Sequence, residues 1–287
     1  MSARILDGRA LAKELREGLA ARAAALERRG ITPRLVVVTA GEDEASRAYA
    51  AGLQKLGSLI GVEVAVDALP PDVAEESLRA RLERYGHDRA THGVMLQQPL
   101  PRSLSIRRIA DAVPARKDVD GTNPINLGRL AFSAGTPLAP ATPAAVMLLL
   151  ERSEKWPLKG RDVTVIGRSS VVGLPLGLLL IAHDATVTVT HRGTRDIRSH
   201  TREADIVVAA AGIPRLVDAS WLQAGATVID VGTTTVDGRL VGDVDFESAA
   251  AVASELTPVP GGVGPVTNVA LMRNLVAAAE ALTGDAT

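Results

Sequence analysis

Short runs of valine, isoleucine and leucine recur along this 287-residue chain, and most are followed by a longer segment with helically spaced apolar residues. The run RLVVVT at 34–39 and the segment 45–60 form one such pair. Strands that alternate with helices predict right-handed βαβ units around a parallel sheet, so the fold class is α/β. We expect strands at 34–39, 62–69, 93–97, 162–167, 186–190, 205–209 and 227–231, and helices at 45–60, 73–85, 172–183 and 266–282.

The N-terminal segment carries the signals of one more helix. Asp7 is a suitable N-cap residue, and Gly30 is a suitable stop. Four leucines between them recur at helical spacing, at positions 11, 15, 19 and 26. A helix between Asp7 and Gly30 is therefore predicted.

Two turn-rich segments interrupt the alternation of strands and helices. Residues 114–143 consist largely of turn formers, and TPVPGGVGPVT at 257–267 is a second such crossing. A long loop inside a compact protein is usually functional or a linker. We therefore expect two α/β domains, one formed by residues 1–120 plus 266–287 and the other by residues 121–265, with site residues on their junction.

Composition excludes several classes of protein. The net charge of −1 provides no basic field for nucleic acid. The chain has no cysteine, which excludes disulfides and thiolate metal sites and fits a reducing cytosol, and no metal site is predicted. The longest uncharged apolar stretch, 171–182, falls short of the roughly 18 residues that a membrane span needs. We expect a cytoplasmic protein without a membrane partner.

The stretch VTVIGRSSVVGLPLG places glycines at 167, 173 and 177 between a predicted strand and a predicted helix. It is not the G-x-G-x-x-G fingerprint of dinucleotide sites. Glycines in such a turn still allow a phosphate to approach backbone N–H groups at a helix N-terminus. A tight turn with close helix packing explains the same glycines, so both interpretations stay open on spacing alone.

The end of the next predicted strand favours one cofactor if the nucleotide interpretation holds. An NAD site expects an acidic residue there to bind the ribose hydroxyls. This chain has His191 and Arg192 instead, and Arg168 follows the first strand. Two arginines near the expected ribose suit a 2′-phosphate, since charge-assisted hydrogen bonds contribute roughly 1.5–3 kcal/mol each. The pattern favours NADP over NAD, whereas the simpler alternative is that Arg192 is only solvated.

Six stretches together resemble one family, the methylenetetrahydrofolate dehydrogenase/methenyltetrahydrofolate cyclohydrolase enzymes. Their order and spacing agree with the family over nearly the whole chain. They are GEDEASRAYAAGLQKLGSLIGV, GVMLQQPLP, KDVDGTNPINLGRL, PATP, VIGRSSVVGLP and TPVPGGVGPVT. Ala141 stands in PATP where the family has cysteine, and Arg192 stands where the family usually has serine.

The resemblance implies two α/β domains with a cleft between them. Tetrahydrofolate derivatives would bind to the domain of 1–120 plus 266–287, and NADP to a Rossmann-like domain of 121–265. The implied catalytic residues are Tyr49, which would stack on the folate ring, Gln97, beside the reacting centre, and Asp120, at the polar edge of the pterin. The implied folate wall is Gly261, Gly262 and Pro265, and the implied NADP site is Gly167, Arg168, Ser169, Arg192 and Thr233. A homodimer is the family's expectation.

Simpler interpretations of the same residues remain. Tyr49 would be an ordinary core residue, Gln97 an ordinary strand end, and Asp120 an ordinary turn acid. The motif context supplied by the resemblance favours the functional interpretation of all three.

The chain departs from the family at position 53. The family's helix reads Y-V-x-x-K-x-K, and its catalytic lysine lies four residues after the tyrosine. Four residues after Tyr49 this chain has Leu53, whereas Lys55 matches the second lysine. Gly61 falls where the family has its glycine, so the register is not shifted. Lys55 would point from a different helix face.

The departure affects one of the two family reactions more than the other. Hydride transfer to NADP requires mainly that the protein orient two ligands. Hydrolysis of the methenyl product requires proton movement, to which a positioned group contributes about 10²–10⁴-fold. We therefore expect an NADP-dependent methylenetetrahydrofolate dehydrogenase with weak or absent cyclohydrolase activity.

Three alternatives stay open. The first is a fully bifunctional enzyme in which Lys55 or a water molecule compensates for the missing lysine. The second is a non-catalytic protein that binds NADP or folate, although the presence of Tyr49, Gln97 and Asp120 argues against it. The third is a shikimate-type dehydrogenase, which shares the two-domain plan but gives no reason for KDVDG or PVPGGVGP.

Overall fold

The computed structural model describes residues 3–41, 44–132 and 138–284 of the chain. The chain forms two compact units. One contains Met1–Lys13 and Thr142–Thr267 and is called here the six-stranded unit; the other contains Glu14–Ala141 and Asn268–Thr287 and is called the three-stranded unit. The predicted domains differ from these units at residues 1–13, 121–141 and 266–267, which the prediction assigned to the other group.

The three-stranded unit has a parallel sheet in the order β3-β2-β4. Its strands are β2 (Arg34–Ala40), β3 (Glu63–Leu69) and β4 (Gly93–Leu96), connected by α2 (Glu44–Ile60) and α3 (Glu75–His87). Leu35 to Ala40 are all buried, which explains why the central strand β2 reads as a continuous apolar run. The predicted bounds of these three strands and two helices lie within two residues of the observed ones.

The expected loop at 114–143 contains a helix that the sequence analysis missed. This helix, α5, spans Pro124–Ala131. Asn123 caps it, since its side-chain oxygen accepts a hydrogen bond of 2.8 Å from the backbone N–H of Ile125, and Pro124 occupies the first turn. Residues 133–137 of the expected loop lie outside the described part of the chain. The short helix α4 (Ile106–Ile109) precedes α5, and α6 (Ala141–Leu150) follows it.

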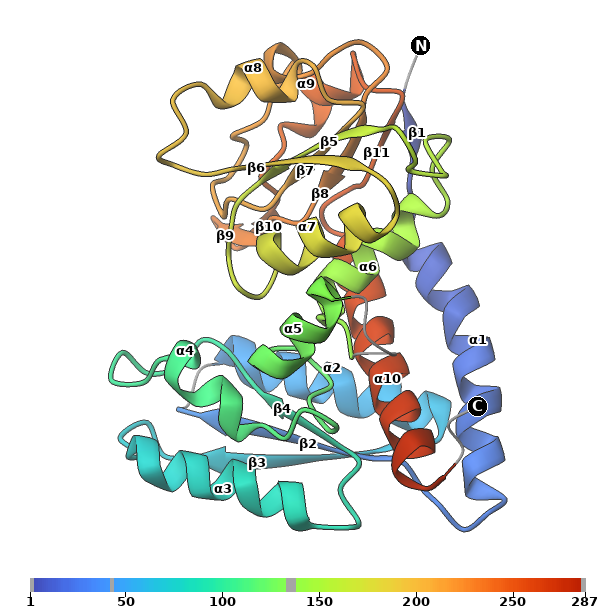
Figure 1. Ribbon diagram of the computed structural model, residues 1–287, viewed down its shortest axis with the longest axis vertical. Helices are drawn as coiled ribbons and strands as arrows, with labels where there is room; N and C mark the ends of the chain where they lie inside the picture. Colours follow the sequence, from blue (N-terminus) through green and yellow to red (C-terminus); the bar gives the residue numbers. More distant parts are fainter. Residues whose placement is uncertain (1–2, 42–43, 133–137, 285–287) are drawn as a thin grey trace. The chain divides into compact units, whose positions relative to one another are not determined.

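The six-stranded unit has a wholly parallel sheet in the order β1-β11-β8-β7-β5-β6. The four predicted strands are present as β5 (Asp162–Ile166), β6 (Thr186–Thr190), β7 (Ile206–Ala209) and β8 (Thr227–Asp230). The helices on either face are α7 (Gly173–Ala182), α8 (Ile197–Thr201) and α9 (Phe246–Ala250). Figure 1 shows α8 and α9 on one side of this sheet and α7 on the other. This is the doubly wound α/β arrangement.

Two very short strands complete the six-stranded sheet. β1 (Arg4–Ile5) pairs in parallel with β11 (Glu255–Leu256), which in turn pairs with β8. The pairing draws the first residues of the chain into this unit, which accounts for the difference from the predicted domain boundary. A small antiparallel hairpin, β9 (Thr234–Val236) with β10 (Arg239–Val241), follows β8.

Two helices of twenty residues pass from one unit into the other, α1 (Gly8–Glu27) and α10 (Val263–Leu282). Asp7 caps α1 as predicted, because its Oδ1 accepts hydrogen bonds from the backbone N–H groups of Arg9 (2.8 Å) and Ala10 (3.1 Å). α10 begins three residues before the predicted start, with Pro265 in its first turn, where proline is tolerated.

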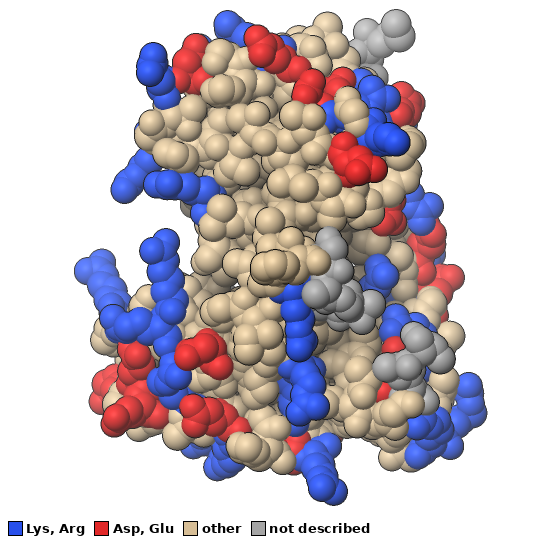
Figure 2. All heavy atoms as spheres, in the orientation of Figure 1, with Lys and Arg blue, Asp and Glu red and all other residues tan. Residues whose placement is uncertain are grey.

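The surface carries charges of both signs. Figure 2 shows Lys and Arg interspersed with Asp and Glu over much of the visible face. Within the described ranges, no helix is both long and apolar enough to cross a membrane.

Candidate active site

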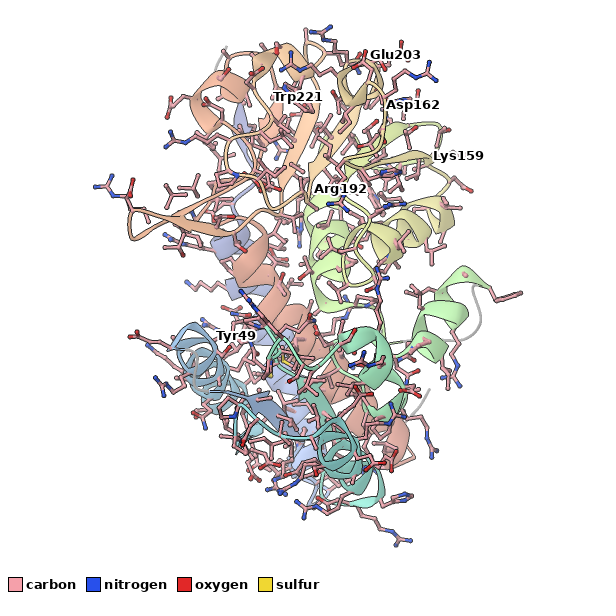
Figure 3. All side chains as sticks on the ribbon, turned by 90° about the vertical axis from the view of Figure 1, so that its left-hand side faces the viewer. Tyr49, Lys159, Asp162, Arg192, Glu203 and Trp221 are labelled. Carbon is pink, nitrogen blue, oxygen red and sulfur yellow. The ribbon has the colours of Figure 1, made fainter. Side chains whose placement is uncertain are left out.

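Tyr49 and Leu53 lie one helical turn apart on α2, the helix that follows the central strand β2. Figure 3 labels Tyr49. Residues four apart in a helix are separated by about 40° around its axis, so the two side chains share a face. Tyr49 is half-buried, and Leu53 is 0% exposed. Lys55, about 200° from Leu53 around the helix, is exposed to solvent, as expected.

Tyr49 and Asp120 lie close enough to influence each other's charge. The pKa of the Tyr49 hydroxyl is raised, first by burial and second by the negative charge of Asp120. Burial also raises the pKa of the Asp120 carboxyl to about 7, with a further contribution from the neighbouring Asp118 carboxylate. The structure thus brings together two of the residues that the sequence analysis singled out.

The other charged residues of the KDVDG segment hold the turn in place. Lys117 is buried and donates from Nζ to the backbone oxygens of Tyr85 (3.1 Å) and Asp88 (2.7 Å). Asp118 is buried and accepts hydrogen bonds from the backbone N–H of Asn123 (2.7 Å) and from the side chains of Asn126 and Thr122. Asp120 accepts no hydrogen bond from any described residue, so its carboxyl remains available to a ligand.

Gln97 follows the last residue of β4 and is only 8% exposed. Its Nε2 donates to the backbone oxygen of Gln98 at 2.9 Å. Its Oε1 is buried and has no hydrogen-bond donor among the described residues. A buried acceptor without a partner costs about 1–3 kcal/mol, and a bound molecule with an N–H or O–H group would remove that cost.

The turn after β5 is shaped by two glycines. Gly167 has a φ of +125°, and a Cβ added to it would lie 2.1 Å from the backbone oxygen of Ala210. A Cβ on Gly173, the first residue of α7, would lie 2.0 Å from the backbone oxygen of Gly167. Ser169 braces the turn, since its Oγ accepts a hydrogen bond of 3.1 Å from the backbone N–H of Val172. No side chain fits at either glycine, because neighbouring backbone atoms fill the space that a Cβ would occupy.

Arg168 and Arg192 lie at the same edge of the six-stranded sheet. β5 and β6 are parallel neighbours, with Ile166 opposite Thr190, and each arginine comes two residues after one of these positions. Neighbouring strands lie about 4.8 Å apart, and their carboxyl ends meet at one edge. Both arginines are exposed, and Figure 3 labels Arg192 on the loop beyond β6.

The remaining predicted residues also belong to the six-stranded unit. Thr233 is exposed between β8 and β9, at the carboxyl edge of the same sheet. Gly261 has a φ of +116° in the turn before α10, and a Cβ on Gly262 would lie 2.6 Å from the backbone oxygen of Pro258. The backbone conformation at Gly261 and the close packing at Gly262 therefore require glycine for the turn to form.

The sequence analysis passed over two acids of the six-stranded unit. Asp230 and Asp243 are buried, and their oxygens accept hydrogen bonds from backbone N–H groups of surrounding turns. Burial raises the pKa of both carboxyls, that of Asp230 to about 6. The only available signal was a glycine near each acid, two residues after Asp230 in DVG and directly before Asp243 in GD. Among the described residues, no cluster of three or more histidines and acids could hold a metal ion.

The six-stranded parallel sheet, with its glycine turn after β5, defines the class of Rossmann-like dinucleotide-binding α/β proteins. Residues 140–283 match the family model "Tetrahydrofolate dehydrogenase/cyclohydrolase, NAD(P)-binding domain", and residues 6–120 match the catalytic domain model of the same family. The chain therefore belongs to the tetrahydrofolate dehydrogenase/cyclohydrolase family and carries its NAD(P)-binding domain. Family membership excludes the shikimate-type alternative.

Relatives and solved structures agree with this assignment over the full length. The chain is 49% identical to "Bifunctional protein FolD" of Roseiflexus sp. (strain RS-1), with 98% of this chain and 97% of the relative covered. The FolD structure from Campylobacter jejuni has a TM-score of 0.94 and 36% identity, covering 98% and 99% of the two chains. The FolD structure from Trypanosoma brucei, complexed with NADP cofactor and inhibitor, has a TM-score of 0.92 and 38% identity, covering 98% of each chain.

Proposed function

We propose that this protein catalyses the NADP-dependent oxidation of methylenetetrahydrofolate to methenyltetrahydrofolate, with weak or absent hydrolysis of the product. The observation that carries the proposal is the fully buried Leu53 on the helix face of Tyr49, where the family's sequence pattern has its catalytic lysine. A leucine side chain has neither a proton donor nor an acceptor, so it can only pack.

Tyr49, Gln97 and Asp120 form the proposed folate site of the three-stranded unit. The ring face of Tyr49 offers a stacking surface for the flat pterin. Pterin rings carry N–H groups, and the unpartnered Oε1 of Gln97 and the carboxyl of Asp120 supply matching acceptors. With a pKa of about 7, Asp120 is partly ionised at neutral pH, so it both accepts and donates. Gly261, Gly262 and Pro265, which belong to the six-stranded unit, remain predicted folate-wall residues.

The residues around the β5 turn suit NADP. The backbone of Gly167 and the N-terminus of α7 suit the pyrophosphate, and Ser169 and Thr233 are proposed to line the same site. Arg168 and Arg192 give two guanidinium groups for a 2′-phosphate at the adjacent strand ends. When bound, NADP supplies the hydride acceptor. The residues of this chain would bind the cofactor and fix its orientation.

The hydrolytic reaction has different requirements. Water must add to the methenyl carbon and release one proton. The bond from that carbon to one ring nitrogen must then break, the second proton of the water must move to that nitrogen, and the carbon keeps the oxygen as a formyl group. A positioned amine assists by about 10²–10⁴-fold. Leu53 supplies no such group, and Lys55 is exposed on another face of α2. We infer that hydrolysis in this protein proceeds at a rate near that in buffer.

One alternative has an observation in its favour. The relatives include proteins named bifunctional at 43% to 49% identity, which supports a working cyclohydrolase in which Lys55 or a water molecule compensates. The non-catalytic alternative has no comparable support, because Tyr49, Gln97 and Asp120 are all present. A cytoplasmic homodimer remains a prediction, which light scattering and fractionation of the source cells test.

The deciding experiment measures two rates on one purified sample. Reduction of NADP with methylenetetrahydrofolate reports the dehydrogenase, and the loss of methenyltetrahydrofolate absorbance reports hydrolysis. We expect rapid hydride transfer with hydrolysis close to the buffer rate. Rapid rates in both assays would establish the bifunctional alternative, and no rate in either, with NADP binding intact, would establish the non-catalytic one.

A further inference from the structure

The six-stranded sheet has a topological switch point beside β5. Strands β6 and β7 lie on opposite sides of β5, so the connections leave in opposite directions. Ligands of open α/β sheets bind outside the carboxyl ends of the strands at such a point. Here the turn after β5 contacts the turn after β7, since a Cβ on Gly167 would lie 2.1 Å from the backbone oxygen of Ala210.

The turn after β7 is held by a carboxylate from a distant part of the chain. Oδ2 of Asp243 accepts hydrogen bonds from the backbone N–H groups of Ala211 (2.6 Å) and Gly212 (2.8 Å). Asp243 is 0% exposed, and its Oδ1 has no donor among the described residues. Both of these hydrogen bonds are directed at the turn beside the switch point.

Asp243 is itself fixed to the end of β8. Oδ1 of Asp230, the last residue of β8, accepts from the backbone N–H groups of Asp243 (2.9 Å) and Gly232 (2.9 Å), and its Oδ2 accepts from that of Val244 (3.0 Å). A Cβ on Gly232 would lie 2.3 Å from Oδ1 of Asp243, and one on Gly242 would lie 1.9 Å from Oδ2 of Asp230. Each carboxylate thus occupies space that would be filled if the neighbouring glycine had a side chain. Through their hydrogen bonds, the two acids connect the turn after β7 to the end of β8.

We propose that Asp243 is a positioning residue for the nicotinamide half of the cofactor, because it fixes the backbone of Ala211 and Gly212 at the switch point. This inference rests on the proposed function, which takes NADP as the dinucleotide. Arg168 and Arg192 follow β5 and β6 and so suit the adenosine half. A dinucleotide that crosses the switch point places its other half over the turns that follow β7 and β8.

The test compares two ligands on one variant, Asp243→Ala. NADP⁺ contains both halves of the cofactor, whereas 2′,5′-ADP contains the 2′-phosphate and adenosine but no nicotinamide. We expect dissociation constants from calorimetry to rise about tenfold for NADP⁺ and to stay within about twofold for 2′,5′-ADP, since two charge-assisted hydrogen bonds that hold only one turn are lost. A general loss of folded protein would lower the binding stoichiometry of both ligands alike without changing either dissociation constant, so the ratio of the two constants reports positioning.

Two control variants sharpen the comparison. Asp245→Ala removes the same charge two residues further on, where Asp245 caps α9 by accepting from the backbone N–H of Ser248 at 3.3 Å, and both affinities should be unchanged. Asp243→Asn keeps an acceptor oxygen for Ala211 and Gly212 and should bind NADP⁺ within about threefold of wild type. If Asp243→Ala does not fold, Gly232→Ala displaces the same carboxylate. Titrations of that variant with NADP⁺ and 2′,5′-ADP then test the proposal.

The proposal is overturned if NADP⁺ and 2′,5′-ADP weaken in parallel, or if neither weakens. A different result identifies failure of the proposed function instead. If wild-type protein prefers NAD⁺ to NADP⁺, the 2′-phosphate assignment is wrong. The dissociation constants of NAD⁺ and ADP for wild type and Asp243→Ala then test the role of Asp243.

Discussion

Leu53 lies one helical turn after Tyr49 on the inner face of α2, and none of its side chain is exposed. Full burial of a leucine stabilises a protein by about 1.5–3 kcal/mol. An ammonium group at the same position would be desolvated and would have a lowered pKa. The position therefore favours either packing or proton transfer, and this chain has the residue suited to packing.

The substitution Leu53→Lys tests the consequence for catalysis. It should raise the hydrolysis of methenyltetrahydrofolate by up to about 10²-fold, because a positioned amine provides general acid–base assistance of that size. Leu53→Met is the matched control, since it keeps an apolar side chain of similar volume and should leave hydrolysis unchanged. Lys55→Ala should also have little effect. Rapid hydrolysis by wild type that disappears in Lys55→Ala would show that Lys55 has taken over the role.

Arg168→Ala tests the preference for NADP. The substitution should raise KM for NADP far more than KM for NAD, by roughly 10-fold or more, since a charge-assisted hydrogen bond to the 2′-phosphate contributes roughly 1.5–3 kcal/mol. Steady-state kinetics with both cofactors provides the measurement. Arg28→Ala, at an exposed position just after α1, controls for the change in net charge. Equal effects of Arg168→Ala on the two cofactors would exclude contact with the 2′-phosphate.

Asp120→Asn tests both folate binding and pH dependence. Because the pKa of Asp120 rises from an unfolded value of 3.8 to about 7, the folded protein holds the proton more tightly. The carboxyl therefore contributes stability at low pH, and this contribution is lost as pH rises from about 4 to about 7. Denaturation experiments should show that wild type loses stability relative to Asp120→Asn as pH rises over this range, because asparagine does not titrate.

The same substitution, Asp120→Asn, should weaken folate binding even where it does not lower stability. At pH 8 Asp120→Asn should melt no earlier than wild type, yet bind tetrahydrofolate derivatives much more weakly, because an amide cannot replace an ionised carboxylate. Asp111→Asn is the control. The hydrogen bond from Arg79 lowers the pKa of Asp111, so wild type should lose stability relative to Asp111→Asn as pH falls, not as it rises. A large drop in melting temperature with intact folate affinity would make Asp120 a structural turn acid.

Two alanine substitutions in α7 distinguish a glycine required by close backbone packing from one that only lowers helix propensity. Gly173→Ala should destabilise the protein by about 1–3 kcal/mol and weaken NADP binding, since the new Cβ would meet the backbone oxygen of Gly167. Gly177→Ala should be neutral or stabilising by up to about 1 kcal/mol, because alanine favours a helix. Its Cβ would meet Val189 Cγ2 at an ordinary 3.5 Å. Thermal melts and NADP titration measure both, and a stable Gly173→Ala that binds NADP normally would contradict the account of the turn.

The sequence by itself determined the α/β class and most of the strands. The apolar run of β2 predicted that strand to within one residue, because a parallel strand buried between helices needs little information beyond its own composition. The alternating sequence TVTVT predicted the partly exposed edge strand β6 with the observed bounds. The absence of a lysine at position 53 was also visible in the sequence. α5 was missed although Asn123 and Pro124 are good helix-start signals, because prolines and glycines dominate the surrounding segment.

Only the tertiary structure decided which acids are free and which hold the fold. KDVDG contains two aspartates with the same local chemistry, yet Asp118 accepts hydrogen bonds from Thr122, Asn123 and Asn126 and Asp120 accepts none from a described residue. The pairing of β1 with β11 and the contact of Asp243 with Ala211 join positions far apart in the sequence. Such contacts depend on how elements pack in three dimensions, and neither residue spacing nor local propensity encodes that packing.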